Sequence, residues 1–118
     1  MPIINRIADY QEELTVWRRY LHQNPELGFE EFKTSDFVAK KLEDMGLSVH
    51  RGLAGTGVVA TLVSGDGTGG SIALRADMDA LPLQEKGSIA HRSETPGKMH
   101  ACGHDGHTTM LLGAAKYL

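Results

Sequence analysis

The spacing of apolar residues changes at Gly46, and this change constrains the fold more than any other feature of the sequence. Before it, apolar side chains recur at alternating steps of four and three, which predicts one helical face formed by Ile3, Ile7, Tyr10, Leu14, Trp17 and Leu21. Asn24-Pro25 should end this first helix, because a residue before proline avoids the helical region. A second helix is expected from about Thr34 to Met45, with Gly46 as its left-handed C-terminal residue.

After Gly46 the pattern indicates short strands. Ser48–Leu53 and Gly57–Val63 are expected to form two of them, and Ser71–Met78 a third that Pro82 limits. Residues 83–99 are polar and irregular, and a last helix should begin near Asp105 or Thr108. The predicted fold class is α/β, with helices packed on a mixed sheet.

Size and charge narrow the function classes. The 118 residues suit one domain, and 41% apolar with 23% charged residues is an ordinary globular mixture. A net charge of −3 and scattered lysines and arginines argue against nucleic-acid binding. The longest apolar run, at 58–63, is far too short to cross a membrane, and the N-terminus lacks a signal pattern, so the cytoplasm is expected. The chain stops at Leu118 without a helix-ending signal, which predicts the N-terminal piece of a larger protein.

The segment His100-Ala-Cys102-Gly-His104-Asp105-Gly-His107 concentrates potential metal ligands. If it is extended, residues 100, 102 and 104 point the same way, and in a helix residues 104 and 107 share a face. Thiolate and imidazole are good zinc ligands, but Cys-x-His is tighter than the spacings of closed structural sites, so a catalytic site completed from elsewhere fits better. Two alternatives stay open: a polar loop with solvated histidines and a buried Cys102, and Cys102 as a nucleophile activated by a histidine.

Two further clusters carry polar residues. Asp77 and Asp79 alternate at the end of the third expected strand, where two like carboxylates repel unless a cation compensates them. The alternative is an ordinary acidic loop whose charge Arg75 screens. The run from His22 to Glu31 is interpreted first as a helix terminator, with His22 favoured near the C-terminal end of the helix.

These clusters, in this order, resemble one family across essentially the whole chain. RRYLHQNPELGFEE, GTGVVATL, ALRADMDALPLQE and PGKMHACGHDGH look like the start of a zinc-type amidohydrolase. The family includes hippurate hydrolases, N-acyl-amino-acid amidohydrolases and indole-acetyl-amino-acid hydrolases, and it is related to aminoacylase and carboxypeptidase G. RADMDALP and HACGHDGH together are its most specific motifs here.

The resemblance implies more than the residues alone do. It implies that residues 1–118 are the N-terminal part of a metallopeptidase-like catalytic domain, with the rest of that domain and a lid domain, which commonly dimerises, lying outside them. Two divalent ions, zinc or manganese, would activate a water that cleaves the amide bond of an N-acyl amino acid or small peptide.

The resemblance also implies roles for single residues. Cys102 would match the ligand that bridges the ions, His104 would match a ligand to one ion, and Asp79 would match the carboxylate that orients the site from behind. Asp77 stands where relatives have a metal-binding histidine, so it is assigned, with His100 and His107, to support behind the ligands. The general-base glutamate is missing, so the chain alone is expected to be inactive. The rival hypothesis is a truncated, non-catalytic chain that binds metal or a partner.

Overall fold

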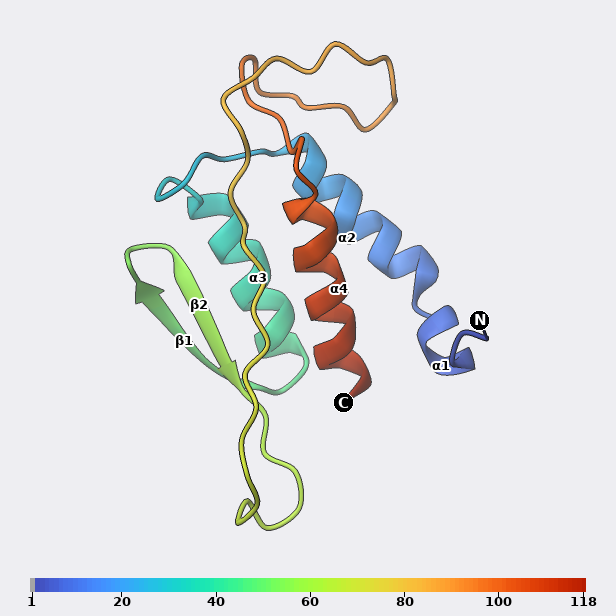
Figure 1. Ribbon diagram of the computed structural model, residues 1–118, viewed down its shortest axis with the longest axis vertical. Helices are drawn as coiled ribbons and strands as arrows, with labels where there is room; N and C mark the ends of the chain where they lie inside the picture. Colours follow the sequence, from blue (N-terminus) through green and yellow to red (C-terminus); the bar gives the residue numbers. More distant parts are fainter. Residues whose placement is uncertain (1) are drawn as a thin grey trace.

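The structure, a computed structural model, describes residues 2–118 of the chain. Its elements, in chain order, are α1 (Asn5–Ala8), α2 (Gln11–Gln23), α3 (Phe32–Asp44), β1 (Ser48–Leu53), β2 (Gly57–Thr61) and α4 (His104–Tyr117) (Figure 1). Among the helices of these residues, none combines the length and the apolar character needed to cross a bilayer.

The helix α3 lies between the hairpin and α4. The two strands contact α3, which also contacts α4, and α4 contacts α2 in turn (Figure 1). Trp17 of α2, Val38 and Leu42 of α3, and Leu112 of α4 form the buried core cluster. Val49 and Val58 of the hairpin are among the residues packed against it. The predicted α/β class, with helices packed on a sheet, is therefore confirmed.

The predicted first helix is broken in two. The chain leaves the helical ladder at Asp9 and Tyr10, where the Tyr10 amide donates to the Ile7 carbonyl at 3.1 Å, a bond over three residues rather than four. Ile3 is 69% exposed, so the N-terminal end of the apolar stripe finds no core to pack against, whereas Trp17 and Leu21 are buried. The periodicity holds for α2, and tertiary packing decides where the helix starts.

The helix α3 ends as the sequence predicts. Gly46 adopts φ 83°, a conformation that glycine reaches without steric cost. Its amide donates to the Glu43 carbonyl at 2.8 Å, and the Leu47 amide donates to the Leu42 carbonyl at 3.2 Å. These two bonds define a Schellman motif, and they point the chain directly into β1.

The sheet has two antiparallel strands, β1 and β2, joined by a tight turn. A bulge between Arg51 and Leu53 lets the strands turn, and Gly57 is required there because a Cβ on it would lie 2.6 Å from the Leu53 carbonyl oxygen.

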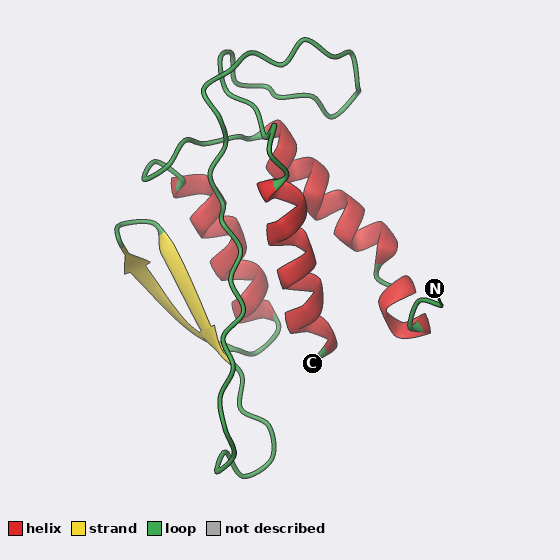
Figure 2. Ribbon diagram, viewed as in Figure 1, coloured by secondary structure: helices red, strands yellow, loops and turns green. Residues whose placement is uncertain are grey.

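The prediction of a third strand at Ser71–Met78 is wrong for residues 2–118. This segment runs extended beside the other elements but is drawn as loop (Figure 2), and it pairs with neither strand. Ile72 is 87% exposed and Leu74 is 58% exposed. The alternating pattern is typical of a strand. A strand also needs a neighbouring backbone to take its hydrogen bonds, and the hairpin does not offer one to this segment.

Candidate metal centre

His104 opens α4 and contacts Asp79. Gly103 precedes it with φ 96°, and this left-handed turn brings the chain into the helix. The Nδ1 atom of His104 lies 2.9 Å from Asp79 Oδ1 and 3.0 Å from the Asp79 carbonyl oxygen. Because a carbonyl oxygen can only accept, Nδ1 donates to Asp79. This leaves Nε2 as the ring nitrogen that can bind a cation.

The segment that carries Asp79 is held on two sides. The Ala80 amide donates to the Glu26 carbonyl at 2.8 Å, and Thr108 Oγ1 of α4 donates to the Asp77 carbonyl at 3.1 Å. Gly28 lies directly beside Asp79, since a Cβ on Gly28 would be 4.0 Å from Asp79 Oδ2. The sequence predicts Asp79 at the end of a strand. Its segment is instead supported by hydrogen bonds to the loop after α2 and to α4.

The other predicted residues near this contact, Cys102, His107 and Asp77, differ in their exposure and in their partners. Cys102 is an exposed free thiol two residues before His104, and His107 is exposed with its ring centroid 5.8 Å from that of His104. Asp77 turns its carboxylate toward Arg75, whose Nη2 lies 2.7 Å from Asp77 Oδ1. The hydrogen bond and the charge of Arg75 lower the pKa of Asp77 below its usual value.

His100, two residues before Cys102, is buried. It is 4% exposed, and neither ring nitrogen has a hydrogen-bond partner among the described residues. Burial lowers its pKa and outweighs the nearby Asp105 charge, which favours the neutral imidazole. Within residues 2–118, this imidazole is thus a buried polar side chain left unsatisfied.

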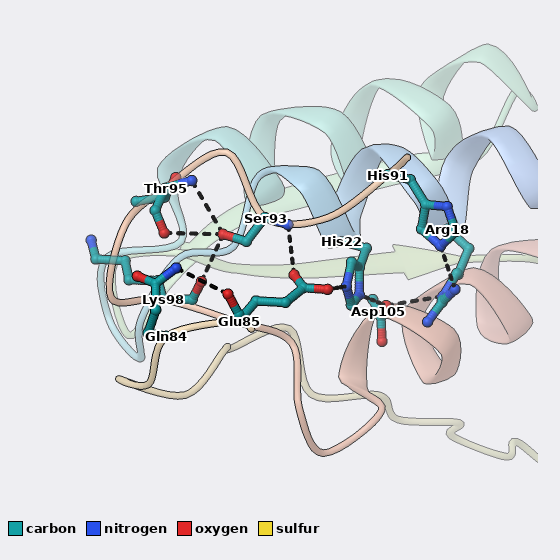
Figure 3. A network of polar contacts seen from close by, with 9 residues as sticks. All are labelled: Arg18, His22, Gln84, Glu85, His91, Ser93, Thr95, Lys98 and Asp105. Atoms are coloured by element: carbon teal, nitrogen blue, oxygen red, sulfur yellow. Dashed lines mark hydrogen bonds and ion pairs between the residues drawn. The ribbon is translucent and has the colours of Figure 1, made fainter. Parts of the chain in front are cut away.

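A buried polar network lies next to this centre, at the end of α2 (Figure 3). His22 Nδ1 lies 2.8 Å from Asp105 Oδ2, and His22 Nε2 lies 3.1 Å from Glu85 Oε1. Arg18 Nε lies 3.0 Å from the same Asp105 oxygen. The network joins α2, the first turn of α4 and the loop at 83–99, which are distant in sequence.

Both carboxylates of the network are held ionised. Burial raises the pKa of Asp105, but the bond from His22, the Gly106 amide and the charge of Arg18 outweigh it and leave the pKa below its usual value. Burial also raises the pKa of Glu85, and the Ser93 amide together with His22 reverses that effect. The Ser93 amide donates to Glu85 Oε2 at 2.6 Å.

Neither this network nor the hydrogen bonds of Glu26 were predicted from the sequence. His22 was interpreted as a helix terminator, and Glu85 had no signal in the sequence. Glu26 accepts hydrogen bonds from the amides of Lys33 and Thr34, at 3.1 and 2.6 Å, and so caps the start of α3. The spacing His-x-x-x-Glu was the available signal, because it places two polar side chains directly around a helix end.

The donor types of this region suit a divalent transition metal, but the described residues form an incomplete set. A thiol, an imidazole with a free Nε2 and a carboxylate behind it are the groups that hold zinc-like ions. Residues 2–118 contain no group of three His, Cys, Asp or Glu side chains placed to hold a metal ion together. The geometry therefore provides part of a metal centre.

Comparisons with known proteins define the class. Residues 73–118 match the family described as Peptidase family M20/M25/M40. The chain is 51% identical over 118 residues to the hippurate hydrolase of Campylobacter jejuni, covering 100% of this chain and 30% of that protein. It is 54% identical over 110 residues to an IAA-amino acid hydrolase of Arabidopsis thaliana, covering 93% of this chain and 25% of that protein.

A solved structure supports the same conclusion. The Bacillus subtilis YXEP protein, described as a dinuclear metal binding peptidase from the M20 family, superposes with a TM-score of 0.87 at 39% identity. The match covers 93% of this chain and 31% of that protein. The chain is thus related to the amidohydrolases and metallopeptidases that act on amino-acid conjugates, and within that class to peptidase family M20. The predicted resemblance is confirmed. The chain spans between a quarter and a third of the length of these relatives.

Proposed function

We propose that residues 1–118 form the N-terminal part of the catalytic domain of a metal-dependent hydrolase. The proposed reaction is hydrolysis of the amide bond of N-acyl or aryl amino acids, or of small peptides, by a water that two divalent ions activate. The observation that carries the proposal is the Asp79–His104 contact two residues from the Cys102 thiol, in a chain related to a dinuclear metal peptidase.

Each of these residues has a proposed task at the reacting centre. Cys102, as a thiolate, would bridge the two ions, and His104 would bind one of them through Nε2. Asp79 would hold the His104 ring by accepting from Nδ1, which fixes its direction and raises its basicity as a ligand. When bound, zinc or manganese supplies a Lewis acid that polarises the amide carbonyl and lowers the pKa of water.

The other three candidates would support the ligands from behind. His100 is buried, and within residues 2–118 neither of its ring nitrogens has a hydrogen-bond partner, so it is available to a group that completes the centre. His107 shares the first turns of α4 with His104. Asp77 presents its backbone carbonyl to Thr108 while its carboxylate pairs with Arg75, so its contribution would come through the position of Asp79.

The remaining ligands, the general base and a lid domain would come from chain beyond these residues. We place the whole protein in the cytoplasm, as a homodimer formed through that lid, with a small amino-acid conjugate as substrate. The chain by itself should be inactive, because no group of three potential ligands is assembled within residues 2–118.

The test compares a longer protein that contains these residues with the 118-residue chain. Hippurate and N-acetyl amino acids are supplied with zinc or manganese, and release of the free amino acid is measured. The longer protein should lose activity with a chelator, regain it with metal, and fail when it carries Cys102→Ala. Activity that survives the chelator would contradict the proposal and favour a cysteine hydrolase. Metal-dependent turnover by the 118-residue chain would contradict the partial-domain interpretation.

A second candidate function is a truncated, non-catalytic chain that binds a metal or a partner, and it is suggested by the general-base glutamate that these residues do not supply. This candidate predicts that no longer protein containing these residues hydrolyses the conjugates. The same assay therefore separates the two candidates.

A further inference from the structure

We infer that His22 is a positioning residue for the proposed metal centre: by bridging Glu85 and Asp105, it fixes the start of α4 and thereby the direction of His104. From the sequence alone, His22 is expected only to end a helix. The consequence for metal binding rests on the proposed function, whereas the consequence for the His104 ring does not.

His22 lies between two carboxylates from distant parts of the chain. Nδ1 faces Asp105 Oδ2 at 2.8 Å, and Nε2 faces Glu85 Oε1 at 3.1 Å. His22 is 3% exposed, so water does not replace either partner. The ring therefore ties the loop at 83–99 to the first turn of α4.

Arg18 of α2 adds a second contact to the same carboxylate. Its Nε lies 3.0 Å from Asp105 Oδ2, but the Arg18 side chain is 42% exposed, whereas Asp105 is 2% exposed. His22 is therefore the buried partner that joins Asp105 to α2.

His22 reaches His104 through Asp105. Asp105 is the second residue of α4 and is 2% exposed, so its carboxylate fixes the first turn of the helix against α2. His104 is the first residue of the same turn, and its Nδ1 contacts Asp79. If Asp105 loses its bond from His22, the partly exposed Arg18 is left as its contact with α2, so the turn is held less firmly and we expect the His104–Asp79 bond to lengthen.

The imidazole nitrogens can be read directly by two-bond proton–nitrogen NMR of the metal-free chain at pH 7. In the wild type, His104 should show a protonated Nδ1 with a bare Nε2. Glu85→Gln alone should leave that signal in place, because the glutamine side chain can still hydrogen-bond to His22 Nε2.

His22→Gln tests the positioning itself. Its amide can donate to Asp105, but its carbonyl oxygen would then face the Glu85 carboxylate, so the single variant should lose the fixed Nδ1–H tautomer of His104. Adding Glu85→Gln gives that oxygen a donor and should restore the His104 signal. Thr56→Val is the matched control, because it removes a buried hydrogen bond to a carboxylate, from Thr56 Oγ1 to Glu31 Oε2 at 2.8 Å, on other elements. It should leave His104 unchanged.

Cobalt affinity then measures the consequence for the metal. Folded His22→Gln should bind cobalt about tenfold more weakly than the wild type, the lower end of the range for groups that orient a ligand. A wild-type His104 signal and affinity in folded His22→Gln would overturn the inference. Failure of the wild type to bind cobalt would overturn the proposed function instead, and the His104 tautomer would still decide whether His22 positions that ring.

Discussion

The two ends of the molecule are organised by different interactions. At the end where α2 stops and α4 starts, charged side chains are buried and bonded to one another across three elements (Figure 3). At the hairpin end, the strands and the extended segment after them leave apolar side chains in water, with Val63 at 71% and Ile72 at 87% exposure. Buried charges therefore organise the first end, whereas part of the second end presents apolar side chains to water.

This difference shows which end of the molecule is held in a single arrangement. A buried charge without a partner is costly, so the network end has few alternative arrangements once it is folded. An exposed apolar side chain makes few contacts and constrains little. The candidate metal centre lies at the end with few alternatives, and that end should respond most strongly to substitution.

Asp105→Ala should have the largest effect on stability. It leaves the buried His22 and the Arg18 guanidinium without their shared carboxylate, and breaking a buried pair in this way costs about 3–5 kcal/mol. Urea unfolding followed by circular dichroism measures the loss. Asp36→Ala is the control, because Asp36 is 70% exposed in its pair with Arg51 and should cost less than about 1 kcal/mol. Equal losses in the two variants would show that the buried network contributes no more to stability than an exposed ion pair.

Asp79→Ala should weaken metal binding with little change in stability. The carboxylate is 38% exposed and supports the His104 ring, and removal of such a partner typically costs about 10–100-fold in affinity. Cobalt titration measures the affinity. Asp77→Ala should cause a smaller loss, because its carboxylate pairs with Arg75 rather than with His104. The reverse order would place the orienting carboxylate at Asp77.

Acid should destabilise the network end. The pKa values of Glu85 and Asp105 are lower in the folded chain than usual, so the unfolded chain takes up protons first as the pH falls. Their contribution is fully present above about pH 4, the range of unperturbed carboxyl groups, and is lost as the pH falls through the folded values. Unfolding free energies between pH 6 and pH 3 measure this dependence. Asp105→Asn should reduce the slope, and an unchanged slope would assign it to other carboxylates.

Ile72→Ser should have the smallest effect, within about 0.5 kcal/mol, because the side chain is almost fully exposed. Leu112→Ala, at 2% exposure in the core, should instead cost about 2–5 kcal/mol. The same urea titration measures both. A large loss for Ile72→Ser would mean that the extended segment is packed, and would remove the contrast between the two ends.

Local features of the fold could be predicted because local interactions produce them. The Schellman end at Gly46, the hairpin and the start of α4 each depend on residues within a few positions of one another. The break between α1 and α2 and the unpaired segment at 71–78 could not be predicted, because each depends on whether a distant surface is present to pack against or to bond.

The same rule holds for the candidate site. Asp79 and His104 were expected together from their motifs, and they do meet, although through a loop held by Glu26 and Thr108 rather than through a strand. His22 bonds to residues 63 and 83 positions away, a pairing that no local pattern encodes. The exposed Cys102 was identified by its chemistry alone, and its role stays a prediction.

Cobalt titration of the wild type and of Cys102→Ala tests that role, and with it the central claim, most directly. A cobalt–thiolate charge-transfer band should appear in the wild type, strengthen as the pH rises and the thiol loses its proton, and be absent in Cys102→Ala, which should bind much more weakly. Circular dichroism should show both proteins folded. Equal affinity in the two proteins, with no band in the wild type, would contradict a metal centre built on Cys102.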